Sequence, residues 1–156
     1  MNKRRAVLTQ SAQLAGMLAT LALLPGVAQA QAAAGYNSAA FDAKTLAEVL
    51  KALGGAAPVE SKDVTITGPD IAENGAVVPV GASTNLPGVK RMLLLVEKNP
   101  SMLSAMFEVS DAVDANFSTR VKMGQSSNVY GVAMMNDGRV LFAQREVKVT
   151  LGGCGG

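Results

Sequence analysis

From residue 58 onward, apolar and polar residues alternate in short segments separated by turn-forming residues. A period of two is typical of β-strands that are buried on one face. Clusters of glycine, proline and asparagine at 68–69, 85–88 and 136–138 mark turns between these segments. The pattern predicts an all-β domain, an immunoglobulin-like antiparallel β-sandwich. The predicted strands are 64–66, 77–80, 89–96, 102–109, 117–123, 129–135 and 140–151.

One short helix is predicted before the strands. Ser38 can cap its first turn, and Gly54 with Gly55 ends it. An amphipathic helix cannot bury its apolar stripe alone, so we expect it to cover the β-domain or a partner. The stripe has the three- and four-residue spacing of one helix face and consists of Leu46, Val49, Leu50 and Leu53.

Some segments carry more specific predictions. Residues 89–96 are strongly apolar, which predicts a central strand buried on both faces. Pro79 cannot donate a ladder hydrogen bond and predicts an edge strand or a bulge, whereas 71–75 is predicted to be a turn. The methionines are expected to fill gaps in a core that has no tryptophan, with an adaptable docking face as the alternative. Those beyond residue 30 are Met92, Met102, Met106, Met123, Met134 and Met135.

The first 30 residues have the pattern of an export signal. A basic start with the pair Arg4-Arg5 precedes an apolar run over 14–24, and Ala28 and Ala30 are the small residues of a cleavage site. This pattern predicts a cleaved bacterial signal peptide, with a twin-arginine route and a periplasmic location. An uncleaved membrane anchor is the alternative.

The remaining chain divides into a linker over 31–37, a domain over 38–151 with the helix and the strands, and an arm over 152–156. Residues 31–156 contain eleven basic and twelve acidic residues, a net charge of −1. The basic character of the whole chain therefore comes from the signal peptide. Neither a nucleic-acid surface nor a membrane anchor is predicted once the signal is removed.

The residue types limit the chemistry that the chain can perform. It contains no histidine, one cysteine and no phosphate-binding glycine loop, so we predict no metal site and no cofactor. Two groups of acidic residues lie close in sequence, Asp63, Asp70 and Glu73 in one and Asp111 and Asp114 in the other. Solvated turns are the expected role for both, and a metal or acid–base pair is the alternative.

The single cysteine is the one reactive side chain of interest that remains. Cys154 lies between Gly152 and Gly153 on one side and Gly155 and Gly156 on the other. Glycine gives the most permissive backbone, and four extended residues span roughly 13 Å at ~3.3 Å each. We therefore predict a flexible C-terminal arm that presents the thiol to other proteins, with a frayed chain end as the alternative. The chain has no histidine to activate the thiol, so activation is expected from the protein that receives the arm.

Several segments resemble one known family. The residues 147–156, and also 70–80, 96–100 and 120–125, are similar to the SoxY family of sulfur carriers, and the leader fits as well. The methionine-rich stretch 102–106 departs from the family pattern. The resemblance covers nearly the whole chain beyond the leader.

The resemblance implies a function as well as a fold. Members of the family are periplasmic β-sandwich proteins that pair with a SoxZ subunit and act as carriers, not enzymes. It implies that the haem cytochrome SoxXA conjugates Cys154 to thiosulfate and that the dimanganese hydrolase SoxB then releases sulfate. The sulfane dehydrogenase SoxCD, where present, oxidises the remaining sulfur.

Two other functions remain open from the residues alone. The chain could be a carrier that uses the Gly155-Gly156 carboxylate as a thiocarboxylate, although this chemistry needs ATP in the cytoplasm and the signal peptide argues against it. It could also be a non-catalytic β-sandwich binding module with an incidental cysteine.

Overall fold

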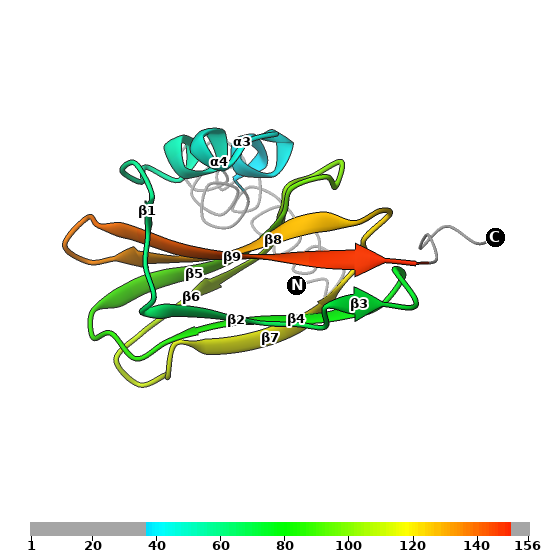
Figure 1. The fold of residues 1–156 in the computed structure, drawn as a ribbon. Helices are drawn as coiled ribbons and strands as arrows, with labels where there is room; N and C mark the ends of the chain where they lie inside the picture. Colours follow the sequence, from blue (N-terminus) through cyan, green and yellow to red (C-terminus); the bar gives the residue numbers. More distant parts are fainter. Residues whose placement is uncertain (1–36, 151–156) are drawn as a thin grey trace, which may run out of the picture. The chain divides into compact units, whose positions relative to one another are not determined.

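The computed structural model describes residues 37–150, which form two β-sheets packed face to face and two helices on one outer side (Figure 1). The larger sheet has the order β1-β9-β8-β5-β6, with β3 also paired to β9, and the smaller has the order β2-β4-β7. The predicted all-β sandwich is confirmed. The larger sheet contains β1 (Val59–Glu60), β3 (Ile71–Ala72), β5 (Val89–Val96), β6 (Leu103–Glu108), β8 (Ser127–Met135) and β9 (Val140–Val149); the smaller contains β2 (Val64–Thr67), β4 (Val78–Thr84) and β7 (Asn116–Val121).

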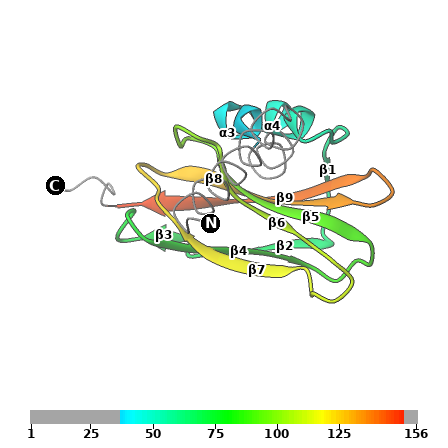
Figure 2. The ribbon, with the colours of Figure 1, turned by 180° about the vertical axis from the view of Figure 1, so that it is seen from behind.

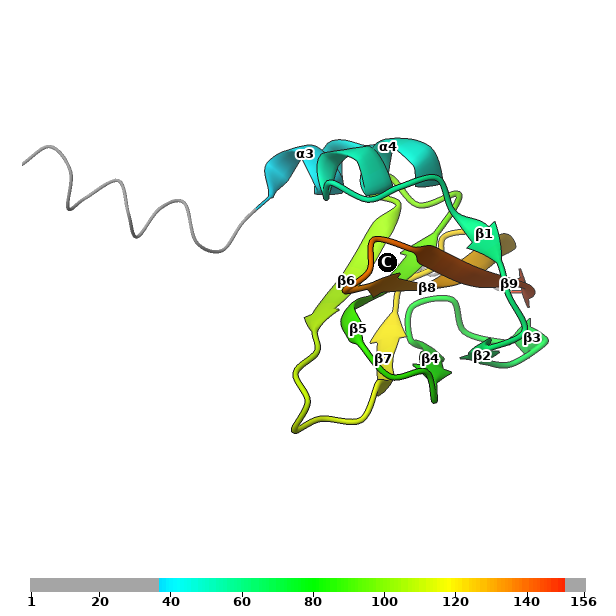
Figure 3. The same ribbon diagram turned by 90° about the vertical axis from the view of Figure 1, so that its left-hand side faces the viewer.

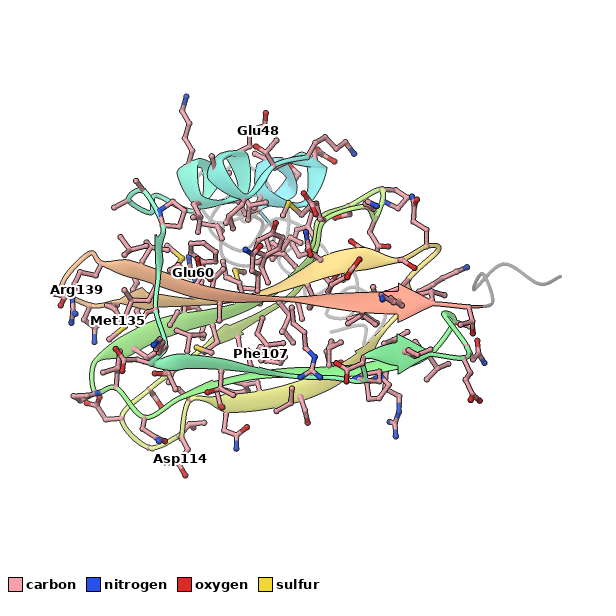
Figure 4. All side chains as sticks on the ribbon, viewed as in Figure 1. Glu48, Glu60, Phe107, Asp114, Met135 and Arg139 are labelled. Atoms are coloured by element: carbon pink, nitrogen blue, oxygen red, sulfur yellow. The ribbon has the colours of Figure 1, made fainter. Side chains whose placement is uncertain are left out.

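The main core lies between the two sheets. Alternate residues of each strand point into this space, as the period of two requires. Gly131 of β8 lets the sheets approach closely, because a Cβ atom there would lie 2.8 Å from the Cβ of Ala82 and 3.0 Å from Cγ1 of Ile66. At one side, Phe107 of β6, labelled in Figure 4, lies between the sheets. Its ring stacks on that of Phe117 of β7, with ring centroids 4.5 Å apart. Buried residues of this core include Val64, Val80, Met92, Leu94, Val96, Val129, Ala133 and Val147.

A second core lies on the outer face of the larger sheet, where the helices α3 (Ser38–Asp42) and α4 (Leu46–Ala52) cover it (Figure 3). Leu93 and Leu95 of β5 point to this side, whereas Met92 and Leu94 point to the main core. β5 is therefore a central strand buried on both faces, as predicted. The helical stripe packs within the chain: Val49 is 0% exposed and Leu50 is 1% exposed.

The prediction of one continuous helix is wrong. The structure has two helices because Thr45 begins a new one: its hydroxyl accepts from the Glu48 N–H, and the Glu48 carboxylate accepts from the Thr45 N–H. This reciprocal capping stops the first helix from continuing. The N–H of Lys44 also donates to Glu48, and these contacts lower the pKa of that carboxyl. The first helix is capped by Asn37 and not by the predicted Ser38.

The methionines lie mainly inside. Five of those predicted to fill the core are at most 7% exposed, and Met106 is partly buried beside the helices. The gap-filling role is confirmed, which leaves little methionine surface for docking. The buried ones are Met92, Met102, Met123, Met134 and Met135.

Pro79 lies in a strand with neighbours on both sides. The prediction of an edge strand is wrong for β4, which pairs with β2 and with β7. Its pairing with β2 runs only from Thr84 to Gly81, however, so Pro79 is paired with β7 alone. The proline therefore lies where one side of the strand needs no ladder hydrogen bond.

The close contact at Gly131 gives a stability prediction. Gly131→Ala should lower the free energy of unfolding by about 1–3 kcal/mol, because the new methyl group meets the backbone-bound Cβ of Ala82. Gly124→Ala is the matched control, since a Cβ there has no atom within 4 Å. Urea denaturation of both variants measures the difference. Equal stabilities would show that the sheets can separate at no cost.

Candidate functional site

Cys154 and the four glycines around it lie outside the described residues, so their role remains a prediction. The structure describes the chain up to Thr150, which lies at the root from which the predicted arm continues. The root is the end of β9, a ten-residue strand whose last residue is Val149. Figure 2 shows this end of the sandwich from behind, with β3 beside it.

Three successive backbone N–H groups at the root have partners on both edges of β9. The N–H of Lys148 donates to the Asp70 carbonyl at 2.9 Å, and the N–H of Thr150 donates to the Ala72 carbonyl at 3.1 Å. Between them, the N–H of Val149 donates to Oγ of Ser126 at 2.9 Å. The strand is therefore held on alternating sides up to the last described residue.

The segment that holds one edge of the root was missed by the sequence prediction. Residues 71–75 were predicted to be a turn, but Ile71 and Ala72 form β3, which pairs in parallel with Lys148 and Val149. A strand of two residues is too short to show a period of two, so no signal in the sequence marks it. The turn prediction is right for the following residues, where Oδ1 of Asn74 accepts from the N–H of Ala76.

An ion pair joins β9 to the start of β3. Nη2 of Arg145 lies 2.5 Å from Oδ1 of Asp70, and the two side chains are 37% and 85% exposed. Arg145 belongs to the same face of β9 as Val147, so its stem lies toward the space between the sheets. Because Asp70 is so exposed, the ion pair contributes little stability. The backbone pairing of β3 with β9 holds the segment.

The surface around the root carries both charged and apolar side chains. Lys148 is exposed beside Ile71, its register partner in β3, and Ile71 itself is 56% exposed. Val77, after the β3–β4 turn, is 53% exposed. Across the same end, the N–H of Met123 donates to the Gly75 carbonyl at 2.7 Å, which ties two of the loops together.

The candidate carboxylates do not converge. Asp63 bonds to the Ser61 hydroxyl at 3.0 Å, and Asp70 pairs with Arg145. Asp111 and Asp114 line a groove of about 500 Å³ at the opposite end of the sandwich (Figure 4). In residues 37–150 no group of three or more His, Cys, Asp or Glu residues is arranged to hold a metal ion. No helix within this range is long and apolar enough to cross a lipid bilayer.

Comparison with known proteins identifies the family. The family model for the sulfur oxidation protein SoxY matches residues 49–154, which is more than half of the chain. The chain belongs to the SoxY family. The matched range contains both the root of the arm and Cys154, and the resemblance predicted from the sequence is confirmed.

Solved structures agree with this membership. The sulfur carrier protein SoxY from Chlorobium limicola f. thiosulfatophilum is 33% identical, with a TM-score of 0.62, and the match covers 69% of this chain and 97% of that one. Superoxide reductase (neelaredoxin) from Ignicoccus hospitalis matches at 15% identity and a TM-score of 0.50, over 55% of this chain and 78% of its own. At that identity only the fold is shared. A comparison with curated proteins found no match.

Proposed function

We propose that this SoxY-family chain is a periplasmic covalent carrier of sulfur intermediates in thiosulfate oxidation, with Cys154 as the attachment site. The observation that supports this most strongly is the family match, which runs through the described domain to Cys154. The similarity to a solved sulfur carrier supports the same role. The end of β9, which is the root of the proposed arm, lies at one end of the sandwich (Figure 1).

Loading joins thiosulfate to the thiol. The terminal sulfur of thiosulfate and the sulfur of Cys154 form a new S–S bond, and the thiol proton is released. The step removes two electrons, which the haem groups of a SoxXA-like cytochrome accept. The product is an S-thiosulfonate on Cys154.

Unloading proceeds through hydrolysis. Water attacks the sulfone sulfur, the bond between the sulfone and the sulfane sulfur breaks, and sulfate leaves, so that Cys154 retains a persulfide. A SoxB-like dimanganese hydrolase performs this step, and a SoxCD-like dehydrogenase oxidises the sulfane sulfur where it is present. In each step the carrier contributes the sulfur atom and its placement, and the partner contributes the catalytic groups.

The proposal includes a SoxZ-like partner subunit and export to the periplasm. The stripe of α4 is buried against the larger sheet of its own chain, so it is not the surface that the partner covers. Residues 1–30 provide the export signal, and cleavage follows Ala30. N-terminal sequencing of the periplasmic protein should find Gln31 first.

The attachment site is tested by intact mass. Incubation of the mature protein with thiosulfate and its oxidising cytochrome should add one thiosulfate per chain, because the chain has a single thiol. Cys154→Ser should abolish the addition. Its matched control is Ser118→Ala, an exposed residue of β7 whose change leaves the thiol in place.

Two other outcomes would contradict the proposal. A mass increase located on Gly156 would indicate a thiocarboxylate carrier, and no increase in the wild-type chain would indicate a binding module with an incidental cysteine.

The length of the arm gives a second test. Deletion of Gly152 and Gly153 shortens the reach of Cys154 by roughly 6–7 Å, at ~3.3 Å per residue. Partner-catalysed turnover should become slower while the unfolding transition stays unchanged, because the deletion lies beyond β9. Replacement of both glycines by alanine keeps the length and is the control. Turnover that is insensitive to the deletion would argue against a reach-limited arm.

A further inference from the structure

The hydrogen bonds of β9 change partner near its end. Pairing with β8 runs from Met134↔Val140 to Ser127↔Val147 and stops there. Beyond Val147, the β8 side of the strand has no backbone acceptor from a paired residue. The hydroxyl of Ser126 fills this place, since its Oγ accepts from the Val149 N–H at 2.9 Å. One side chain thus extends the sheet by one hydrogen bond.

The other edge of β9 is held by backbone over the same residues. The carbonyls of Asp70 and Ala72 accept from Lys148 and Thr150, so Val149 is the only one of the three N–H groups that depends on a side chain. Ala72 is 6% exposed in the main core, which fixes this segment.

We infer that Ser126 is a positioning residue that, together with the 70–72 segment, anchors the end of β9 and so sets where the Cys154 arm begins. With the anchor in place, Thr150 is the last held residue, and the proposed tether to Cys154 comprises four residues, 151–154. If the end of β9 leaves both edges, Val147 is the last paired residue, and it is 0% exposed. The tether then comprises seven residues, 148–154. The effect of the anchor on Cys154 rests on the proposed carrier function. The anchoring of β9 by Ser126 does not depend on that function.

A longer tether lowers the concentration of the thiol at a partner's site. Effective concentration falls roughly as the −3/2 power of tether length once the tether spans the gap. An increase from four residues to seven therefore reduces it about twofold. A small soluble reagent does not depend on tether length, so its reaction with the thiol should not change.

The neighbouring residue provides a matched control. Ser127 is 3% exposed, and its Oγ accepts from the Lys98 N–H at 3.0 Å, in the turn between β5 and β6. Ser127→Ala removes a buried hydroxyl of the same type, one residue away, without touching the hydrogen bonds of Lys148, Val149 or Thr150. Ser126→Thr keeps the hydroxyl and should behave as wild type.

The anchor is tested first without any partner. Native-state hydrogen exchange of the mature protein should show the Val149 amide exchanging about fivefold faster in Ser126→Ala, the change expected from one lost hydrogen bond of about 1 kcal/mol. The Leu93 amide in the core should be unaffected. Ser127→Ala should leave Val149 exchange unchanged even if the protein is less stable overall. Unchanged exchange at Val149 in Ser126→Ala would overturn the inference.

The consequence for the arm is tested by loading. Ser126→Ala frees only the β8 edge, because the Asp70 and Ala72 carbonyls still accept from Lys148 and Thr150. It should therefore lower kcat/KM for cytochrome-catalysed loading by at most about twofold and leave the rate with a small aromatic disulfide unchanged, and Ser126→Thr should restore kcat/KM. Equal kcat/KM in wild type and Ser126→Ala would overturn the positioning role. If the wild-type chain is not loaded at all, the proposed function fails, and the exchange result still decides whether Ser126 anchors the strand.

Discussion

The pairing of β9 on both edges is the constraint on which the rest of the structure depends. β8 pairs with one edge over eight residue pairs, while β1 and β3 pair with the other edge at its two ends. The longest strand is therefore fixed in direction over its whole length. Because the sequence continues from β9 toward Cys154, the end of this strand is the root of the proposed arm.

The packing around β9 fixes the strand that leads to the proposed arm. The main core lies between the sheets, and the second core lies under α3 and α4, on the outer face of the larger sheet. Near the root, the main core includes Ala72 of β3 and Met123 of the loop between β7 and β8, which are 6% and 0% exposed. Under the proposed carrier function, this core would support the root while a partner acts on Cys154.

Most of the fold follows from local patterns, and the exceptions have identifiable causes. The predicted strands 129–135 and 140–151 agree with β8 and β9 to within two residues at each end, and Asn136 to Gly138 gives the turn between them. The Thr45-x-x-Glu48 capping pattern in the sequence marks the break between α3 and α4. The prediction of a single helix followed the apolar stripe instead and missed this break. β3 could not be found because two residues carry no periodicity and depend on a strand 77 positions away in the Ile71↔Lys148 pair.

The candidate site also has one part that the sequence predicts and one part that only the fold reveals. Cys154 and its glycines are predicted from the sequence alone, because a single thiol between two glycine pairs is an unusual pattern, and they lie outside the described residues. The groups around the root are not evident, since only the fold brings Ser126 to Val149 and Asp70 to Arg145.

The most direct test of the central claim is the chemical state of Cys154 in protein taken from its own cells. The protein should be purified from cells grown on thiosulfate and cleaved after Lys148, and the mass of the 149–156 peptide should be measured. The carrier function predicts sulfane or sulfonate adducts on Cys154 that a thiol reductant removes and that are absent when thiosulfate is withheld. A peptide whose Cys154 is always a free thiol, with or without thiosulfate, would contradict it.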